Sequence, residues 1–116
     1  MDEKWKILLY RTSQGDSPVK EFIDGLELKA QSKVRNTINL LKDFGTNTSS
    51  PHIKKLIGTR LWELRVLGAD SIRIFYVAIT GKTFLLLHGF KKKKNKTLDK
   101  EIKIAEKRLA DHLFRS

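Results

Sequence analysis

The sequence predicts one α+β domain over residues 1–116, in which helices pack on a mainly antiparallel sheet. Residues 61–96 hold three runs of branched and aromatic residues, separated by glycine-containing turns, as in a β-meander. Residues 18–44 contain two stretches with apolar residues at helical spacing, and residues 98–113 contain a third. We therefore expect a sheet of about four strands that carries two N-terminal helices and a C-terminal helix.

The N-terminal part predicts a strand followed by two helices. Residues 4–11 (KWKILLYR) are typical of a first strand. A helix is expected to start at Ser17 and Pro18, because serine caps helices and proline fits the first turn. A second helix is expected over residues 28–44, with Gly45 as its C-terminal cap. The apolar stripes of both helices indicate core positions rather than chemistry.

The rest of the chain predicts the remaining elements. Residues 45–52 form a polar loop, and residues 53–57 suggest a short extended segment or edge strand. The meander follows over residues 61–90, with Gly68-Ala69-Asp70 and Thr80-Gly81 as its turns. After the lysine run, Thr97 is the expected N-cap of the last helix.

The turn lengths predict a row of basic groups across the meander. Arg65 would face Arg73, and Arg73 would face His88, all on one face of the sheet. Two opposed arginines repel, so either Glu63 bridges them or an anion is bound there. A shift of one residue would move His88 to the other face.

The distribution of charge favours a polyanionic partner. The formal net charge is +11, of which +1 lies in residues 1–50 and +10 in residues 51–116. A basic half of this kind is typical of nucleic-acid binding. A solvated basic surface, or a face covered by an acidic protein, stays open as an alternative.

Several classes of function are disfavoured. The chain has no cysteine, which removes disulfides, thiolate zinc sites and cysteine nucleophiles. No run approaches the roughly 20 apolar residues of a membrane span, and the N-terminus does not resemble a secretory signal, so we expect a cytoplasmic protein without a membrane partner. The three histidines (His52, His88 and His112) show no metal-ligand spacing, and we expect no metal or cofactor.

Motifs spread over nearly the whole chain resemble the phage-derived, HigB-like branch of the RelE/ParE toxin superfamily. They are Ser17-Pro18-Val19-x-Glu21-Phe22, Lys55-Leu56-x-Gly58-x-x-Leu61-Trp62-Glu63-Leu64-Arg65, Arg73-Ile74-Phe75-Tyr76, Leu86-Leu87-His88-Gly89-Phe90-x-Lys92-Lys93 and Glu101-Ile102-x-x-Ala105. The resemblance implies helices on one side of an antiparallel sheet and a concave basic face on the other. It also implies a toxin of a type II toxin–antitoxin system that cleaves mRNA on the ribosome and forms a hetero-oligomer with a helix-turn-helix, HigA-like antitoxin.

The implied chemistry is attack of an RNA 2′-hydroxyl on the adjacent phosphate, without a metal. By resemblance, Arg73 is expected to clamp the phosphate, since a guanidinium binds phosphate through two hydrogen bonds. Lys92 and Lys93 would steady the phosphate or the leaving oxygen, and His88 would act as acid or base unless it only fills a sheet position. Further candidates for binding RNA or phosphate are Arg65, Lys54, Lys55, Arg60, Lys91, Lys94 and Lys96.

Two other functions stay open at this point. A ParE-like protein would inhibit DNA gyrase by binding to it, without being an enzyme. A catalytically inactive basic module would only bind an antitoxin or nucleic acid.

Overall fold

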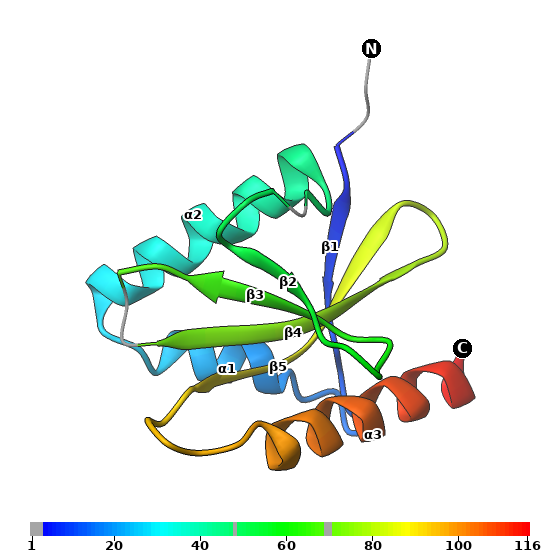
Figure 1. Ribbon diagram of the computed structural model, residues 1–116. Coiled ribbons are helices and arrows are strands. Elements are labelled where there is room, and N and C mark those ends of the chain that lie inside the picture. The colour runs from blue at the N-terminus through cyan, green and yellow to red at the C-terminus, as the bar shows by residue number, and fades with distance from the viewer. Residues whose placement is uncertain (1–3, 48, 69–70) are drawn as a thin grey trace.

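A computed structural model describes residues 4–47, 49–68 and 71–116, and it confirms the α+β class (Figure 1). Its elements are β1 (Lys6–Leu9), α1 (Pro18–Asp24), α2 (Leu28–Phe44), β2 (Ile53–Lys55), β3 (Trp62–Val66), β4 (Ile72–Ile79), β5 (Thr83–Lys91) and α3 (Asp99–Arg115).

The sheet of the described residues has five strands in the order β1-β5-β4-β3-β2, rather than about four. The meander β3-β4-β5 lies at its centre, as predicted. The predicted segments 4–11 and 53–57 both contain edge strands: β2 pairs antiparallel with β3, and β1 pairs parallel with β5. The sheet is therefore mainly antiparallel, with one parallel pair at its edge.

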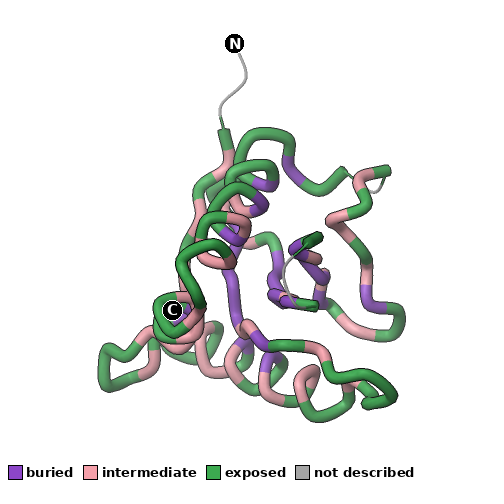
Figure 2. Tube along the Cα trace, turned by 90° about the vertical axis from the view of Figure 1, so that its left-hand side faces the viewer, coloured by how far each residue is buried: buried purple, intermediate pink, exposed green. Residues whose placement is uncertain are grey.

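The helices cover both faces of the sheet. Alternation along β4 sends Ile72, Ile74 and Tyr76 into the core shared with α1 and α2. Phe75 and Val77 point the other way, into a second core shared with α3. Figure 1 shows α2 and α3 on opposite sides of the strands, and in Figure 2 the buried segments lie between helices with exposed outer turns.

This two-sided arrangement corrects the expectation of helices on one side and an open basic face on the other. The second face carries Phe75, Leu85 and Leu87, all buried, and these apolar side chains need cover from water. Helix α3 supplies it with Ala105 and Leu109. Basic groups on this face must therefore lie beyond the part that α3 covers.

The strand register was predicted correctly for one hairpin and wrongly for the other. Arg65 faces Arg73 as expected, whereas Arg73 faces Phe90, and His88 faces Phe75. The β4–β5 turn spans three residues, because Ile79 pairs with Thr83. A bulge between the Phe75 and Tyr76 pairs then shifts the register a second time.

The two shifts act together on the side-chain pattern. Each one alone would move His88 to the opposite face of the sheet. Their sum returns it to the face of Arg73, opposite Phe75, which is two residues further along β4. Residues Ala69 and Asp70 of the predicted first turn lie outside the described residues.

Helix ends agree with the sequence in two of three cases. Ser17 and Pro18 start α1, although the Ser17 hydroxyl makes no capping hydrogen bond. Gly45 caps α2 with φ +68°, and its N–H donates to the Leu41 carbonyl. The predicted N-cap Thr97 is wrong, because Leu98 occupies that position. Over residues 4–47, 49–68 and 71–116, no helix combines the length and apolarity that crossing a bilayer requires.

Substitution of Gly89 tests the packing of α1 on β5. A Cβ atom at Gly89 would lie 2.6 Å from Cδ2 of Phe22. We expect Gly89→Ala to lower the free energy of unfolding by about 1–3 kcal/mol in urea titrations, because the ring or the strand must shift. Gly25→Ala is the control, since its Cβ would meet nothing closer than 3.5 Å. Equal losses for both variants would contradict this packing.

Candidate functional site

A buried carboxylate joins the two opposed arginines on the α3 face of the sheet. Glu63 is 1% exposed, and its Oε1 lies 2.9 Å from Nε of Arg65. Its Oε2 lies 3.6 Å from Nε of Arg73. This bridging confirms the structural interpretation left open by the sequence, and it explains how two like charges can face each other.

The bridge leaves binding capacity on both guanidinium groups. Each guanidinium has five N–H donors, and the contacts with Glu63 are made through the Nε atom of each. The contact with Arg73 exceeds hydrogen-bond length, and its Nε has no hydrogen-bond partner among the described residues. The side chains are 34% exposed for Arg65 and 17% for Arg73. Two positive charges against one negative charge leave a net cation that an anion can reach.

His88 lies between two charged side chains of α3. Its Nε2 is 2.7 Å from Oε1 of Glu101, and its Nδ1 is 3.1 Å from Nη1 of Arg108. Nη1 of Arg108 also donates to the Leu87 carbonyl at 2.9 Å. Because arginine can only donate, Nδ1 of His88 must accept, so its proton resides on Nε2 and is donated to Glu101.

This environment keeps the imidazole neutral. Burial lowers the pKa of His88, and the Arg108 charge lowers it further, while the Glu101 hydrogen bond and charge act in the opposite direction. Its side chain is 11% exposed. Both ring nitrogens are already engaged, so the arrangement favours an orienting role over the acid or base role that the sequence suggested.

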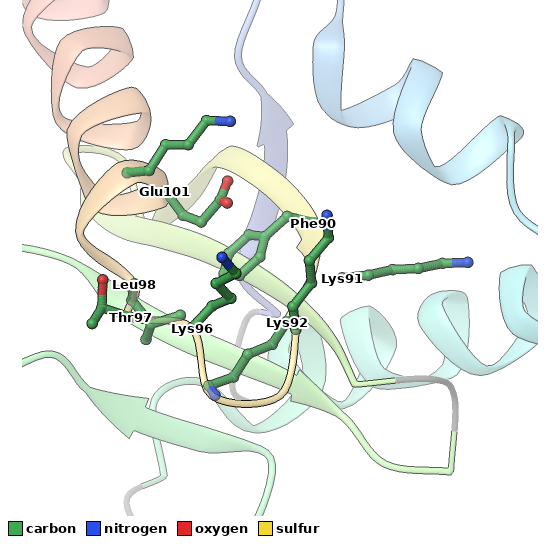
Figure 3. A pocket seen from close by; sticks show the side chains of 9 residues that line it. Phe90, Lys91, Lys92, Lys96, Thr97, Leu98 and Glu101 are labelled. Carbon is green, nitrogen blue, oxygen red and sulfur yellow. The ribbon is translucent and has the colours of Figure 1, made fainter.

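A basic pocket of about 320 Å³ opens between the end of β5 and the start of α3. Figure 3 shows Phe90 from β5, Lys96 from the connection and Glu101 from α3 facing the same space. Thr97 and Leu98 complete its wall at the α3 N-terminus. The pocket is lined by five lysines: Lys91, Lys92, Lys93, Lys96 and Lys100. Such a lining attracts anions, and the helix N-terminus adds to that attraction.

Phe90 connects the pocket to the arginine pair. It faces Arg73 across the β4–β5 ladder, and its ring stacks on His88 with centroids 5.3 Å apart. Lys92 then donates its N–H to the Ser71 carbonyl at 3.0 Å, which holds the lysine segment beside β4. One end of the sheet therefore brings together Arg65, Arg73, His88 and the lysines of the pocket.

The other predicted binding residues are dispersed. Lys54 is exposed on the edge strand β2, opposite Glu63, so it flanks the arginine pair. Lys55 instead donates to the backbone of Leu56 and Thr59, and its ammonium lies 5.9 Å from the Trp62 ring. Lys55 therefore stabilises its own loop.

Arg60 and Lys94 also lie outside the pocket wall. Arg60 lines a separate groove of about 550 Å³ beside the C-terminal half of α3. Lys94 is exposed in the connection before α3. The structure therefore groups these two residues with neither the arginine pair nor the pocket lining.

Sequence reasoning missed the roles of Glu101, Arg108 and Phe90. Glu101 and Arg108 are seven positions apart, which places them on one side of a helix. That spacing was visible in the sequence. Their common partner His88 was not, because the contact depends on how α3 packs against β5.

The histidines do not form a metal centre. His52 is half-buried, and its Nδ1 lies 3.0 Å from the Arg65 carbonyl oxygen. Within the part of the chain that the structure describes, no group of three potential ligands is placed to hold a metal ion.

The chain matches a known protein family. Residues 21–110 match the model of the family described as "Phage derived protein Gp49-like (DUF891)". The matched span runs from α1 to α3 and includes the arginine pair and the pocket. The curated proteins contain no match to this chain.

The burial of neutral His88 predicts a pH dependence of stability. Its pKa is lowered on folding, so the unfolded chain binds more protons as the pH falls through the ordinary value near 6.5. We expect the free energy of unfolding to fall from about pH 8 toward about pH 5, and His88→Gln to flatten that decline. Urea titrations across this range measure it.

His112→Gln is the matched control for this prediction. It removes a half-buried histidine from the last turn of α3, one turn beyond Arg108, where the side chain lines a groove with Leu109 and Leu113. The charged groups that face His88, Glu101 and Arg108, stay in place. An undiminished pH dependence in His88→Gln would exclude His88 as its source.

Proposed function

The chain belongs to the Gp49-like family of phage-derived proteins, a family of RelE toxin type, and from this premise we propose that it is a HigB-like toxin. Its proposed activity is ribosome-dependent cleavage of mRNA, which inhibits translation. Its proposed partner is a helix-turn-helix, HigA-like antitoxin that neutralises it in a hetero-oligomer. The observation that carries the enzymatic part is the lysine pocket beside the arginine pair.

An RNA strand suits this surface electrostatically. Residues 51–116 hold a net charge of +10, and the pocket lysines and both arginines belong to that half. The lysine-lined pocket has a volume of about 320 Å³, at the lower end of the range of small-ligand sites, about 300–1,000 Å³. Lysines from the connection and arginines from β3 and β4 would contact successive phosphates of one strand.

The proposed reaction is an internal transesterification. The 2′-oxygen forms a bond to the adjacent phosphorus, and the bond from phosphorus to the 5′-oxygen breaks. One proton leaves the 2′-hydroxyl and another reaches the 5′-oxygen, which gives a 2′,3′-cyclic phosphate and a 5′-hydroxyl. Arg73 would bind the non-bridging oxygens, and Lys92 or Lys93 would stabilise the added charge and protonate the leaving oxygen.

Loss of Arg73 tests this proposal. We expect Arg73→Ala to abolish growth arrest in bacteria and to slow mRNA cleavage on purified ribosomes by about 100-fold or more, because a donor to the phosphate is removed. Melting curves check the fold, since Glu63 keeps Arg65 as its partner. Cleaved ends are identified by their cyclic phosphates.

Lys29→Ala is the control for charge, because Lys29 is exposed on α2, across the sheet from the site. It should retain full toxicity. Growth arrest without mRNA cleavage, accompanied by inhibition of DNA supercoiling by gyrase, would replace the proposal with the ParE-like function. Absence of both effects would favour the inactive binding module.

The salt dependence of RNA binding tests the pocket lysines. Changing Lys92, Lys93 and Lys96 together to Gln should reduce the slope of log affinity against log salt by about 2, since each phosphate contact with a single strand contributes about 0.7. Filter binding of a short single-stranded RNA at several salt concentrations measures the slope.

A triple variant of exposed lysines away from the pocket, Lys29, Lys42 and Lys107 to Gln, has the same net charge. It should leave the slope nearly unchanged. Equal reductions in both triple variants would mean that RNA senses overall charge and does not occupy the pocket.

A further inference from the structure

We propose that Glu101 is the catalytic base of this site and that His88 and Arg108 are the positioning residues that hold it. The inference rests on the proposed RNA cleavage and assigns the one step that the basic groups cannot perform. That step is removal of the proton from the attacking 2′-hydroxyl.

The pocket lining leaves few groups able to accept a proton. Lysine and arginine side chains are protonated at neutral pH and act only as donors. Thr97 carries a hydroxyl, whose oxygen is a poor base. Of the described residues that line the pocket, Glu101 is the one with a carboxylate. It is 25% exposed, so RNA can approach it while protein surrounds most of the side chain.

His88 is not available for the same task. Its Nε2 proton is donated to Oε1 of Glu101 over 2.7 Å, and its Nδ1 faces the donor Nη1 of Arg108. Taking a further proton at Nδ1 would oppose two N–H groups 3.1 Å apart. The imidazole therefore stays neutral and acts as a donor to the carboxylate.

The three side chains form an anchored series. Nη1 of Arg108 donates to the Leu87 carbonyl oxygen at 2.9 Å, which fixes the position of the guanidinium group beside His88. His88 is further held by its stacking on Phe90. Its hydrogen bond occupies Oε1 of Glu101 and sets the direction of the carboxylate. The second oxygen is not used by this hydrogen bond, and Glu101 lines the pocket (Figure 3). A base that is already oriented avoids an entropic cost at the transition state.

The proton balance of the step is then complete. Glu101 takes the 2′-hydroxyl proton as the bond from the 2′-oxygen to phosphorus forms. A pocket lysine gives its proton to the 5′-oxygen as that bond breaks. The lysines also hold the phosphate whose charge increases in between. Proton exchange with water restores both groups afterwards.

Glu101→Gln separates this role from simple docking of α3 on β5. The glutamine carbonyl still accepts the His88 hydrogen bond, so the melting temperature should be unchanged, and RNA affinity should not fall because a negative charge is removed from a basic pocket. We expect single-turnover cleavage on ribosomes to fall by about 100-fold or more, within the range of a lost general base. Glu106→Gln is the control, because Glu106 is an exposed carboxylate of the same helix outside this pocket.

Chemical rescue provides a readout that a docking role would not affect. Glu101→Ala should recover a measurable cleavage rate in sodium formate, relative to sodium chloride of the same concentration, because formate can take the vacant base position. The His88→Phe variant should cleave slowly and gain nothing from formate, since the Glu101 carboxylate is still present but has lost the hydrogen bond that orients it.

The outcomes distinguish failure of the Glu101 assignment from failure of the proposed mRNA cleavage. If the wild type cleaves mRNA and Glu101→Gln cleaves at a similar rate, Glu101 is not the base, while the proposed function stands. Failure of formate to raise the rate of a folded Glu101→Ala variant would also overturn the assignment. If the wild type itself does not cleave mRNA, the proposed function fails and this inference fails with it.

Discussion

The buried carboxylate of Glu63 is the constraint on which the site depends. Arg65 and Arg73 face each other on adjacent strands. Without an anion between them, the repulsion of their charges would destabilise this pairing of β3 with β4. Glu63 is 1% exposed and supplies the negative charge between the two guanidinium groups. One negative charge cannot neutralise both guanidinium groups. Glu63 therefore stabilises the β3–β4 pairing and still leaves a residual positive charge on the two arginines.

The position of α3 determines what this charge can act upon. Apolar residues on the second face of the sheet require cover, and α3 provides it from Ile102 onward. Its first turn reaches past the covered area and meets the end of β5 at Phe90 and His88. The pocket lies at this boundary, where packing ends and the lysine segment begins. One helix therefore makes apolar contacts along its length and charged contacts at its start.

The β-bulge in β5 links these two features. It returns His88 to the face that α3 covers, next to Glu101 and Arg108. Without this shift, the imidazole would point toward α1 and α2, and Glu101 would lose its donor. Bulges frequently redirect a side chain near functional sites, and this one aligns a neutral histidine behind a carboxylate. The site is thus an arrangement of oriented groups in addition to a patch of positive charge.

The sequence by itself determined the element types, the core stripes and the opposition of Arg65 and Arg73, because side-chain periodicity and a short loop are local properties. It also showed where positive charge accumulates. Only the tertiary structure decided that helices cover both faces and that β1 joins β5 in parallel, since those choices depend on burying two apolar faces at once. The grouping of His88 with Glu101 and Arg108 likewise required a bulge in β5 and the packing of α3, which no local pattern specifies. A shift of one residue in the strand pairing moves each side chain to the opposite face of the sheet.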